Sequence, residues 1–229
     1  AEAFGAGHVL LAEAGTGTGK TLAYLVPAVL SGQRVVVSTA TRTLQEQVFF
    51  KDLPLLRDQV GLPVSAALLK GRSNYLCVHR FEAFERAPLF ALPEDAAPWE
   101  RLRRWALTTE TGDRAESELP DEWAPWAQVS TTSEACLGAR CPRHDACFVT
   151  RARREAADCQ LIVVNHHLFF ADLALRDSGV AELLPTVDAA VFDEAHQIVE
   201  TGVQFLGTLL GTGQVIDFGR DLLAATLAQ

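Results

Sequence analysis

Short apolar runs that end at polar turns recur along the chain. Four of them are "HVLLAEA" before "GTGTGKT", "RVVVST" before "ATRTLQEQ", "LIVV" before "NHHL", and "AAVF" before "DEAH". Short continuous apolar runs are typical of strands that are buried on both faces of a parallel sheet. Helical stretches at 21–30 and 43–50 lie between them. This alternation of strand and helix predicts an α/β fold with a doubly wound parallel sheet.

The polar motifs after these runs are expected to share one edge of the sheet. In open α/β sheets, ligands bind beyond the carboxyl ends of the strands. Each of the four motifs follows the carboxyl end of an expected strand. The topology therefore predicts a common binding edge.

The first motif is a candidate phosphate-binding loop. "AGTGTGKT" matches the pattern G-x-x-x-x-G-K-[ST], with alanine in place of the first glycine. Its glycines let backbone N–H groups face phosphates, and the following helix adds its positive N-terminal end. The alternative is a glycine-rich turn, which the Lys-Thr pair at the helix start argues against. We expect Lys20 to reach the β- and γ-phosphates of a nucleotide and Thr21 to ligate Mg²⁺. The expected nucleotide-binding residues are Ala14, Gly15, Thr16, Gly17, Thr18, Gly19, Lys20 and Thr21.

The segment "VFDEAH" at 191–196 supplies the acidic half of such a site. An acid at the end of a buried strand is costly unless it serves a cation, so Asp193 is expected to hold Mg²⁺ through water. Glu194 is placed to polarise the attacking water as general base. His196 is expected to couple the nucleotide state to a neighbouring domain. The alternative is an acidic first turn of a helix, which the presence of the phosphate loop argues against.

Five cysteines raise a separate question. The N-terminus lacks a secretory signal, and in a reducing compartment clustered cysteines indicate metal ligands or redox groups. Four thiolates suit either tetrahedral Zn²⁺ or a [4Fe–4S] cluster, and the lack of a C-x₂-C pair favours iron–sulfur while leaving zinc open. Cys159 precedes an expected core strand and is assigned no ligand role. His144 is interpreted as a loop residue. The four candidate ligands are Cys77, Cys136, Cys141 and Cys147.

The motifs together resemble a known family. "AGTGTGKT" and "DEAH" look like motifs I and II of superfamily 2 helicases, in which alanine at the first loop position is usual, and "TATRTLQEQ" resembles their motif Ia. A four-cysteine segment between motifs Ia and II resembles the iron–sulfur DNA helicases typified by XPD. The phrases "LLKGRSNYLC", "CLGARCPRHDACF" and "VVNHHLFFADLALR" are particularly similar to the bacterial DinG and YoaA branch.

The resemblance implies a RecA-like P-loop NTPase fold with an inserted, mostly helical iron–sulfur domain. It also implies ATP-driven 5′→3′ translocation on single-stranded DNA, unwinding of forked duplexes, and a role in DNA repair or replication stress. Its cofactors are ATP, Mg²⁺ and a [4Fe–4S] cluster. Plain helix capping by Thr41 or Thr43 is the alternative for motif Ia. The DNA contacts that it implies are Thr39, Thr41, Arg42, Thr43 and Asn165, with a contact or coupling role for His166.

The same resemblance suggests a domain plan. Residues 1–70 and 155–206 form the first motor domain, 71–154 form the iron–sulfur domain, and 207–229 begin an arch-like helical insertion. The tryptophans of the insert fill its core or stack on DNA bases. The chain contains no methionine, so we expect its ends to be boundaries within a longer protein. A second motor domain would supply the arginine that completes catalysis, and this chain alone is expected to bind nucleotide weakly without efficient hydrolysis or unwinding.

Composition limits the other possibilities. A net charge of −9 over 229 residues argues against a protein that coats nucleic acid through bulk positive charge, although it permits local arginine clusters. No apolar run approaches the roughly 20 residues that cross a bilayer, so we expect no membrane segment. The missing secretory signal favours a cytoplasmic protein, and the resemblance to DNA helicases implies association with the nucleoid. The competing hypotheses are a redox-responsive iron–sulfur DNA-binding module with a structural nucleotide, and a zinc-stapled NTPase acting on something other than DNA.

Overall fold

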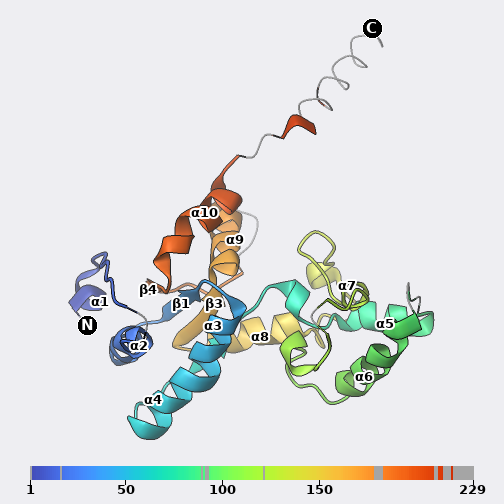
Figure 1. Ribbon diagram of the computed structural model, residues 1–229, viewed down its shortest axis with the longest axis horizontal. Coiled ribbons are helices and arrows are strands. Elements are labelled where there is room, and N and C mark those ends of the chain that lie inside the picture. Colours follow the sequence, from blue (N-terminus) through green and yellow to red (C-terminus); the bar gives the residue numbers. More distant parts are fainter. Residues whose placement is uncertain are drawn as a thin grey trace.

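The chain forms a four-stranded parallel sheet with helices on both faces (Figure 1). The computed structural model describes residues 2–15, 17–88, 90, 93–120, 122–177, 183–208, 211–213 and 218. The strand order is β2-β3-β1-β4. The strands are β1 (Val35–Thr39), β2 (Ala66–Leu68), β3 (Leu161–Asn165) and β4 (Ala189–Phe192). Three of the four expected strands are thereby confirmed, and β2 is an addition that the sequence pattern did not indicate.

Helices cover the two faces of the sheet with separate hydrophobic cores. Val35 and Val37 of β1 face one core, together with Leu25 and Leu56 from two of the covering helices. Val36 points to the opposite core, because successive side chains of a strand alternate between faces. The sheet helices are α2 (Lys20–Leu30), α3 (Arg42–Gln47), α4 (Leu53–Gln59), α8 (Phe148–Ala157), α9 (His166–Asp177) and α10 (Ile198–Leu206). The doubly wound α/β prediction is confirmed.

The helical stretch expected at 43–50 is longer and less regular than predicted. Helix α3 continues through a π-helical turn, η1 (Val48–Asp52), into α4, where Pro54 occupies the first turn. Because Pro54 has no N–H to donate to the preceding turn, it interrupts the regular hydrogen bonds of the helix, and π-helical turns are found at such irregularities. The turn therefore joins two short helices into one rod against the first core.

The expected strand at "HVLLAEA" is wrong. Residues 8–15 have no regular secondary structure, and the side chains of Val9, Leu10 and Leu11 are 93%, 72% and 88% exposed. An apolar run forms a strand only where a sheet edge offers hydrogen bonds and another layer covers it. Strand β4 is one edge of the sheet, and among the described residues it pairs only with β1, so residues 8–15 do not extend the sheet there.

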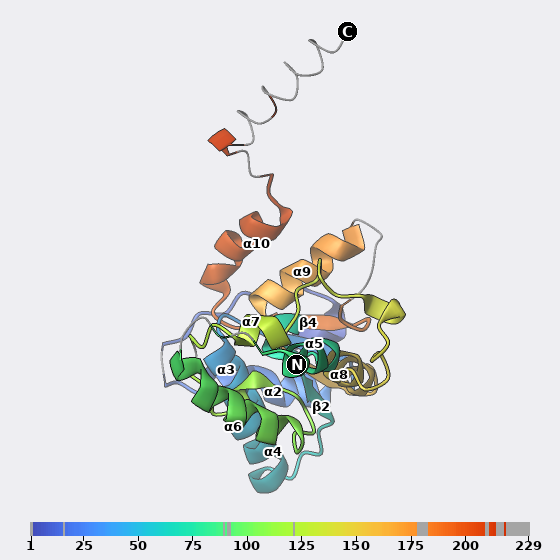
Figure 2. The ribbon, with the colours of Figure 1, turned by 90° about the vertical axis from the view of Figure 1, so that its right-hand side faces the viewer.

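The segment between β2 and β3 builds its own small core, and its helices face the viewer in Figure 2. Its helices lie to one side of the sheet and are α5 (Val78–Arg86), α6 (Ala96–Ala106) and α7 (Trp126–Val129), with the short turns η2 (Arg72–Asn74), η3 (Pro93–Asp95), η4 (Arg114–Glu116) and η5 (Gly138–Arg140). We call residues 71–154, the predicted inserted domain, the insert. Trp99, Trp123 and Trp126 are buried in it, so their rings fill its core.

One glycine is required by this packing. The backbone of Gly112 has a φ of +67°, and a Cβ there would lie 2.3 Å from Cγ of Phe148.

Two backbone hydrogen bonds connect the start of the insert to its middle. Leu76 N donates to Gly112 O at 2.8 Å, and Cys77 N donates to Val129 O at 2.7 Å. The insert is thus a packed unit, while its boundaries at 71 and 154 stay predictions.

Two further findings complete the fold. The remaining short elements are α1 (Glu2–Ala6) and η6 (Ala195–Gln197). Among the helices described, none combines the length and apolar character needed to pass through a bilayer. The expected arch-like segment at 207–229 falls almost wholly outside the described residues.

Candidate nucleotide site and DNA-facing groove

The phosphate loop leads directly into helix α2. Gly17 and Gly19 adopt φ values of +75° and +84°, a left-handed conformation that residues with a Cβ rarely adopt. Lys20 is the first residue of the helix, so the N-terminal N–H groups open toward the loop. Thr16 lies outside the described residues. The loop has the geometry that anion binding at a helix N-terminus uses.

The phosphate loop and the DEAH segment meet in space. Nζ of Lys20 lies 3.3 Å from Oε1 of Glu194, although 174 positions separate the two residues. Both side chains are about one-third exposed, so the pair lies at the rim of the fold, open to a ligand. The sequence prediction that these two motifs share an edge of the sheet is thereby supported by geometry.

The acidic pair is fixed by the end of β4. The backbone N–H of Asp193 donates to the carbonyl of Ser38 at 2.8 Å, and the N–H of Glu194 donates to Oδ1 of Asp193 at 3.1 Å. Glu194 has a φ of +56°, which is uncommon for a residue other than glycine. Such backbone strain is found where the surrounding structure fixes a functional side chain.

Tyr24 is a member of this site that the sequence motifs did not reveal. Its hydroxyl donates to Oδ2 of Asp193 at 3.4 Å. Burial, followed by the charge of Asp193, raises the pKa of Tyr24 well above its usual range. The hydroxyl of Tyr24 therefore lies beside one of the two expected Mg²⁺ ligands. The signal was available, because Tyr24 follows Lys20 by four positions on a helix and shares its face.

His196 and His166 have different surroundings. His196 is mostly exposed, with Nδ1 at 3.5 Å from Oε2 of Glu194. His166 is buried, with Nδ1 at 2.7 Å from Oγ of Ser38, and burial lowers its pKa. His166 thus connects the end of β3 with β1 beside the DEAH segment, a position that suits the coupling role better than a direct DNA contact.

The residues expected from motif Ia divide into two groups. Thr39 is fully buried and donates to the carbonyls of Thr41 and Val164, so its side chain does not face a ligand. Oγ1 of Thr41 accepts from Leu44 N at 3.2 Å and caps α3, which is the alternative that the sequence left open. Arg42 and Thr43 are exposed at the N-terminal turn of α3. Oδ1 of Asn165 accepts from Leu168 N at 2.9 Å in the first turn of α9.

An open groove of about 390 Å³ is lined by the exposed end of α3 and by the insert. Three arginines from separate elements line it, namely Arg42 of α3, Arg80 of α5 and Arg114 of η4. Glu122 is the acidic residue of the lining, and hydroxyl and amide groups are added by Ser73, Asn74, Ser130, Thr131 and Thr132. The apolar part of the lining consists of Trp123, Ala124, Trp126 and Ala127. The sequence motifs did not indicate that Arg80 and Arg114 lie near Arg42, because their approach depends on the fold of the insert.

The four candidate cysteines are half-buried free thiols. Cys136, Cys141 and Cys147 lie on consecutive tight turns, and Cys77 and Cys147 directly precede α5 and α8. Sγ of Cys136 accepts from Nη1 of Arg72 and from the N–H of Gly138, each at 3.5 Å. Burial raises the pKa of Cys77, and the other three thiols raise it further.

These thiols are near one another without forming a metal centre. Within the part of the chain that the structure describes, no three Cys, His, Asp or Glu side chains are grouped closely enough to hold one metal ion. The donor set fits a metal–thiolate centre in its chemistry, since it offers four sulfurs with N–H and guanidinium donors beside them. Cys159 lies apart, against the second sheet core, in agreement with its expected structural role.

Known proteins are similar to the chain over most of its length. Residues 1–85 match the sequence model of the DEAD/DEAH box helicases. The chain is 41% identical, over 93% of its length, to the ATP-dependent DNA helicase YoaA of Haemophilus influenzae, and 40% identical over 96% to YoaA of Escherichia coli. It is 41% identical, over 87% of its length, to the ATP-dependent helicase DinG of Mycobacterium tuberculosis. The chain spans about a third of the length of these relatives.

Proposed function

We propose that this chain is the first motor domain of an ATP-dependent DNA helicase of the DinG and YoaA kind. The observation that carries the proposal is the contact between Lys20 and Glu194, which joins the phosphate loop to the DEAH segment at one edge of the sheet. The match of residues 1–85 to DEAD/DEAH box helicases and the similarity to YoaA and DinG support the same assignment. The arrangement of the motifs agrees with a RecA-like fold.

The chemistry of the site follows from its side chains. Lys20 exchanges the carboxylate of Glu194 for the phosphate oxygens of ATP, and the N-terminal N–H groups of α2 hold the same phosphates. Thr21 and Asp193 would hold Mg²⁺, and the hydroxyl of Tyr24 donates to Asp193 at 3.4 Å. A bound Mg²⁺ would supply positive charge against the phosphates. Glu194, once released from Lys20, orients and deprotonates the attacking water.

The working protein is proposed to move 5′→3′ along single-stranded DNA and to open forked duplexes in DNA repair or replication stress. These properties come from the family resemblance, and so does a cytoplasmic, nucleoid-associated location. This chain alone is proposed to lack efficient hydrolysis, because an arginine from a second motor domain is worth roughly 10³-fold or more in rate. The groove between α3 and the insert is the proposed path of the strand, since three arginines suit successive backbone phosphates.

Replacing Arg42 by alanine tests the DNA site. Each lysine or arginine that neutralises a phosphate contributes about one unit to the slope of log affinity against log salt concentration. We expect Arg42→Ala in the full-length protein to reduce this slope by about one unit, measured by fluorescence anisotropy with a labelled oligothymidine. Arg101→Ala, on an exposed position of α6 outside the groove, is the matched control. Equal slopes for both variants and the unaltered protein would contradict the proposed path.

We further propose that Cys77, Cys136, Cys141 and Cys147 hold a [4Fe–4S] cluster that fixes the insert. The cluster would contribute a rigid link between Cys77 and the segment 136–147, without a step in ATP hydrolysis. Spacing and donor chemistry support it, and zinc is the other metal that four thiolates suit.

Metal analysis of anaerobically purified full-length protein distinguishes these choices. We expect about four irons per chain, with absorption near ~400 nm, for a single cubane cluster. Cys77→Ser should abolish the iron, while Cys159→Ser should retain it, since Cys159 packs against the sheet core. One zinc per chain, or iron that survives Cys77→Ser, would refute the assignment.

A further inference from the structure

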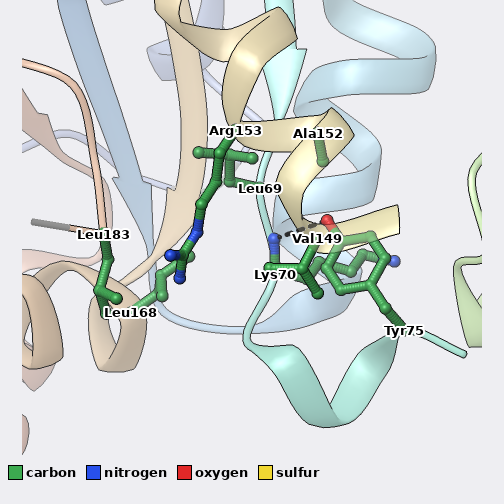
Figure 3. Close-up of a pocket in the computed structure, with 8 residues that line it drawn as sticks. All are labelled: Leu69, Lys70, Tyr75, Val149, Ala152, Arg153, Leu168 and Leu183. Atoms are coloured by element: carbon green, nitrogen blue, oxygen red, sulfur yellow. Dashed lines mark hydrogen bonds between the residues drawn. The ribbon is translucent and has the colours of Figure 1, made fainter. Parts of the chain in front are cut away.

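A buried ammonium group lies where helix α3 meets the insert, outside the nucleotide site. The side chain of Lys70 is 2% exposed and follows the end of β2 (Figure 3). A lysine is almost never buried to this extent unless it is paired. Its partners therefore indicate why it is there.

Lys70 is paired with two carboxylates from different parts of the chain. Its Nζ lies 2.6 Å from Oε1 of Glu46, in α3, and 2.6 Å from Oδ2 of Asp113, in the insert. Asp113 is itself fixed, because it pairs with Tyr75 in an isolated bridge and accepts from Ala115 N at 3.1 Å. One ammonium group thus joins the helix that begins at Arg42 to the middle of the insert.

Neighbouring groups fix the same junction. The fully buried Gln45, next to Glu46, donates to the carbonyls of Leu69 and Val163 at 2.6 and 3.1 Å. The N–H of Lys70 donates to the hydroxyl of Tyr75 at 3.1 Å, the contact drawn in Figure 3. Burial raises the pKa of that tyrosine to about 12. A shift of α3 relative to the insert would break several of these bonds at once.

The space beside Lys70 is hardly large enough to hold water in place of a lost partner. The cavity beside Lys70 has a volume of about 10 Å³ and is lined by Arg153, Tyr75 and apolar side chains, which is near the lower limit for one water molecule. Removing one member of a buried ion group therefore leaves the others unpaired, whereas neutralising the whole group is often tolerated. This difference supplies the variants for a test.

We infer that Lys70 is a positioning residue that places the exposed end of α3, and with it Arg42, in register with the insert. The inference rests on the proposed function, because it assigns Lys70 to the DNA site without a contact to DNA. The chain of ion pairs that connects the insert to α3 consists of Asp113, the ammonium group of Lys70 and Glu46, which lies three residues after Thr43. The orientation of the insert would thereby set the affinity of α3 for a single strand.

A double-mutant cycle tests this role in the full-length protein. Lys70→Met and Arg42→Ala are each expected to weaken oligothymidine binding about tenfold, within the usual range of coupling between sites. If Lys70 acts through Arg42, the double variant should also lose about tenfold, whereas independent effects would multiply to about a hundredfold. Asp113→Asn should behave like Lys70→Met in the same cycle. Lys51→Met, the same replacement at an exposed lysine, should leave the affinity unchanged.

The outcomes are distinct. A hundredfold loss in the double variant, or unchanged affinity for Lys70→Met, overturns the positioning role while the DNA site stands. An unchanged affinity for Arg42→Ala instead refutes the DNA site itself. If Lys70→Met does not fold, as judged by circular dichroism, the neutral triple variant Lys70→Met, Glu46→Gln, Asp113→Asn takes its place. This triple variant should fold and bind oligothymidine about tenfold more weakly than the wild type. Wild-type affinity in the triple variant would also overturn the positioning role of Lys70.

Discussion

Replacing Glu194 by glutamine is expected to lower ATP turnover of the full-length protein by roughly 10²–10⁴-fold, the usual contribution of a general base. Glutamine keeps the size of the side chain and the strained backbone of the site while removing the proton acceptor. Nucleotide affinity should be kept or increase, because the carboxylate that pairs with Lys20 at 3.3 Å no longer competes with phosphate. Single-turnover kinetics with radiolabelled ATP separate the two effects.

The control for this variant is Glu200→Gln, an exposed carboxylate in the first turn of α10. It makes the same chemical change near the DEAH segment without touching the phosphate loop, so turnover should be unaffected. Turnover that survives Glu194→Gln would assign the water-activating role to another group. An equal loss in both variants would point to a general effect of charge.

Replacing Trp99 by alanine is expected to destabilise the insert by about 3–5 kcal/mol, the usual loss for a buried tryptophan. Trp99 is 4% exposed and packs against the rings of Phe81, Phe84 and Phe90 at centroid distances of 5.6, 5.0 and 6.2 Å. The deletion would leave a cavity that these rings cannot fill without leaving their packed positions. Urea unfolding followed by circular dichroism measures the loss.

Leu107→Ala is the control for the tryptophan, because Leu107 directly follows α6 and is 86% exposed. It should change the free energy of unfolding by less than about 0.5 kcal/mol. A small effect of Trp99→Ala would mean that the insert is held together by something other than its aromatic core. A bound metal would then be the leading candidate, and the iron analysis of the cysteine variants would decide.

The sequence predicted most of the sheet and the meeting of its motifs. Strands β1, β3 and β4 are apolar on both faces, and this pattern has few alternatives in a chain with intervening helices. Their register aligns Thr39 with Asn165 and Ser38 with Phe192, so the following motifs share an edge. The local sequence pattern was sufficient to predict this shared edge, because the carboxyl ends of parallel strands always lie at the same edge of a sheet.

Other features depend on contacts that a local pattern does not contain. Val9, Leu10 and Leu11 have the apolar pattern of a buried strand, yet they pair with no strand of the described sheet and stay exposed. Lys70 looked like an ordinary polar residue after β2, and its burial follows from two carboxylates that lie 24 and 43 positions away. The sequence also did not predict that Arg80 and Arg114 lie near Arg42, because these residues are far apart in the chain and meet only in the folded protein.

The cysteines illustrate a third limit. Spacing identified four candidate ligands and separated Cys159 from them, and the structure places Cys159 against the sheet core. Spacing could not tell how far apart the sulfurs would lie, and the described residues do not form a closed metal site. Metal binding and folding are coupled in such sites, because four ionised thiols repel one another until a cation joins them. The chemistry of the metal is therefore a question for analysis of the purified protein.

The central claim is that Lys20, Asp193 and Glu194 form one Mg·ATP site in a DNA-driven motor. The most direct test is the ATP turnover of the full-length protein in Mg²⁺, measured while single-stranded oligothymidine is titrated in. The account predicts slow hydrolysis alone and a saturable rise as the strand binds, with no rise when Mg²⁺ is chelated. Tight ATP binding with turnover that does not respond to the strand would contradict it.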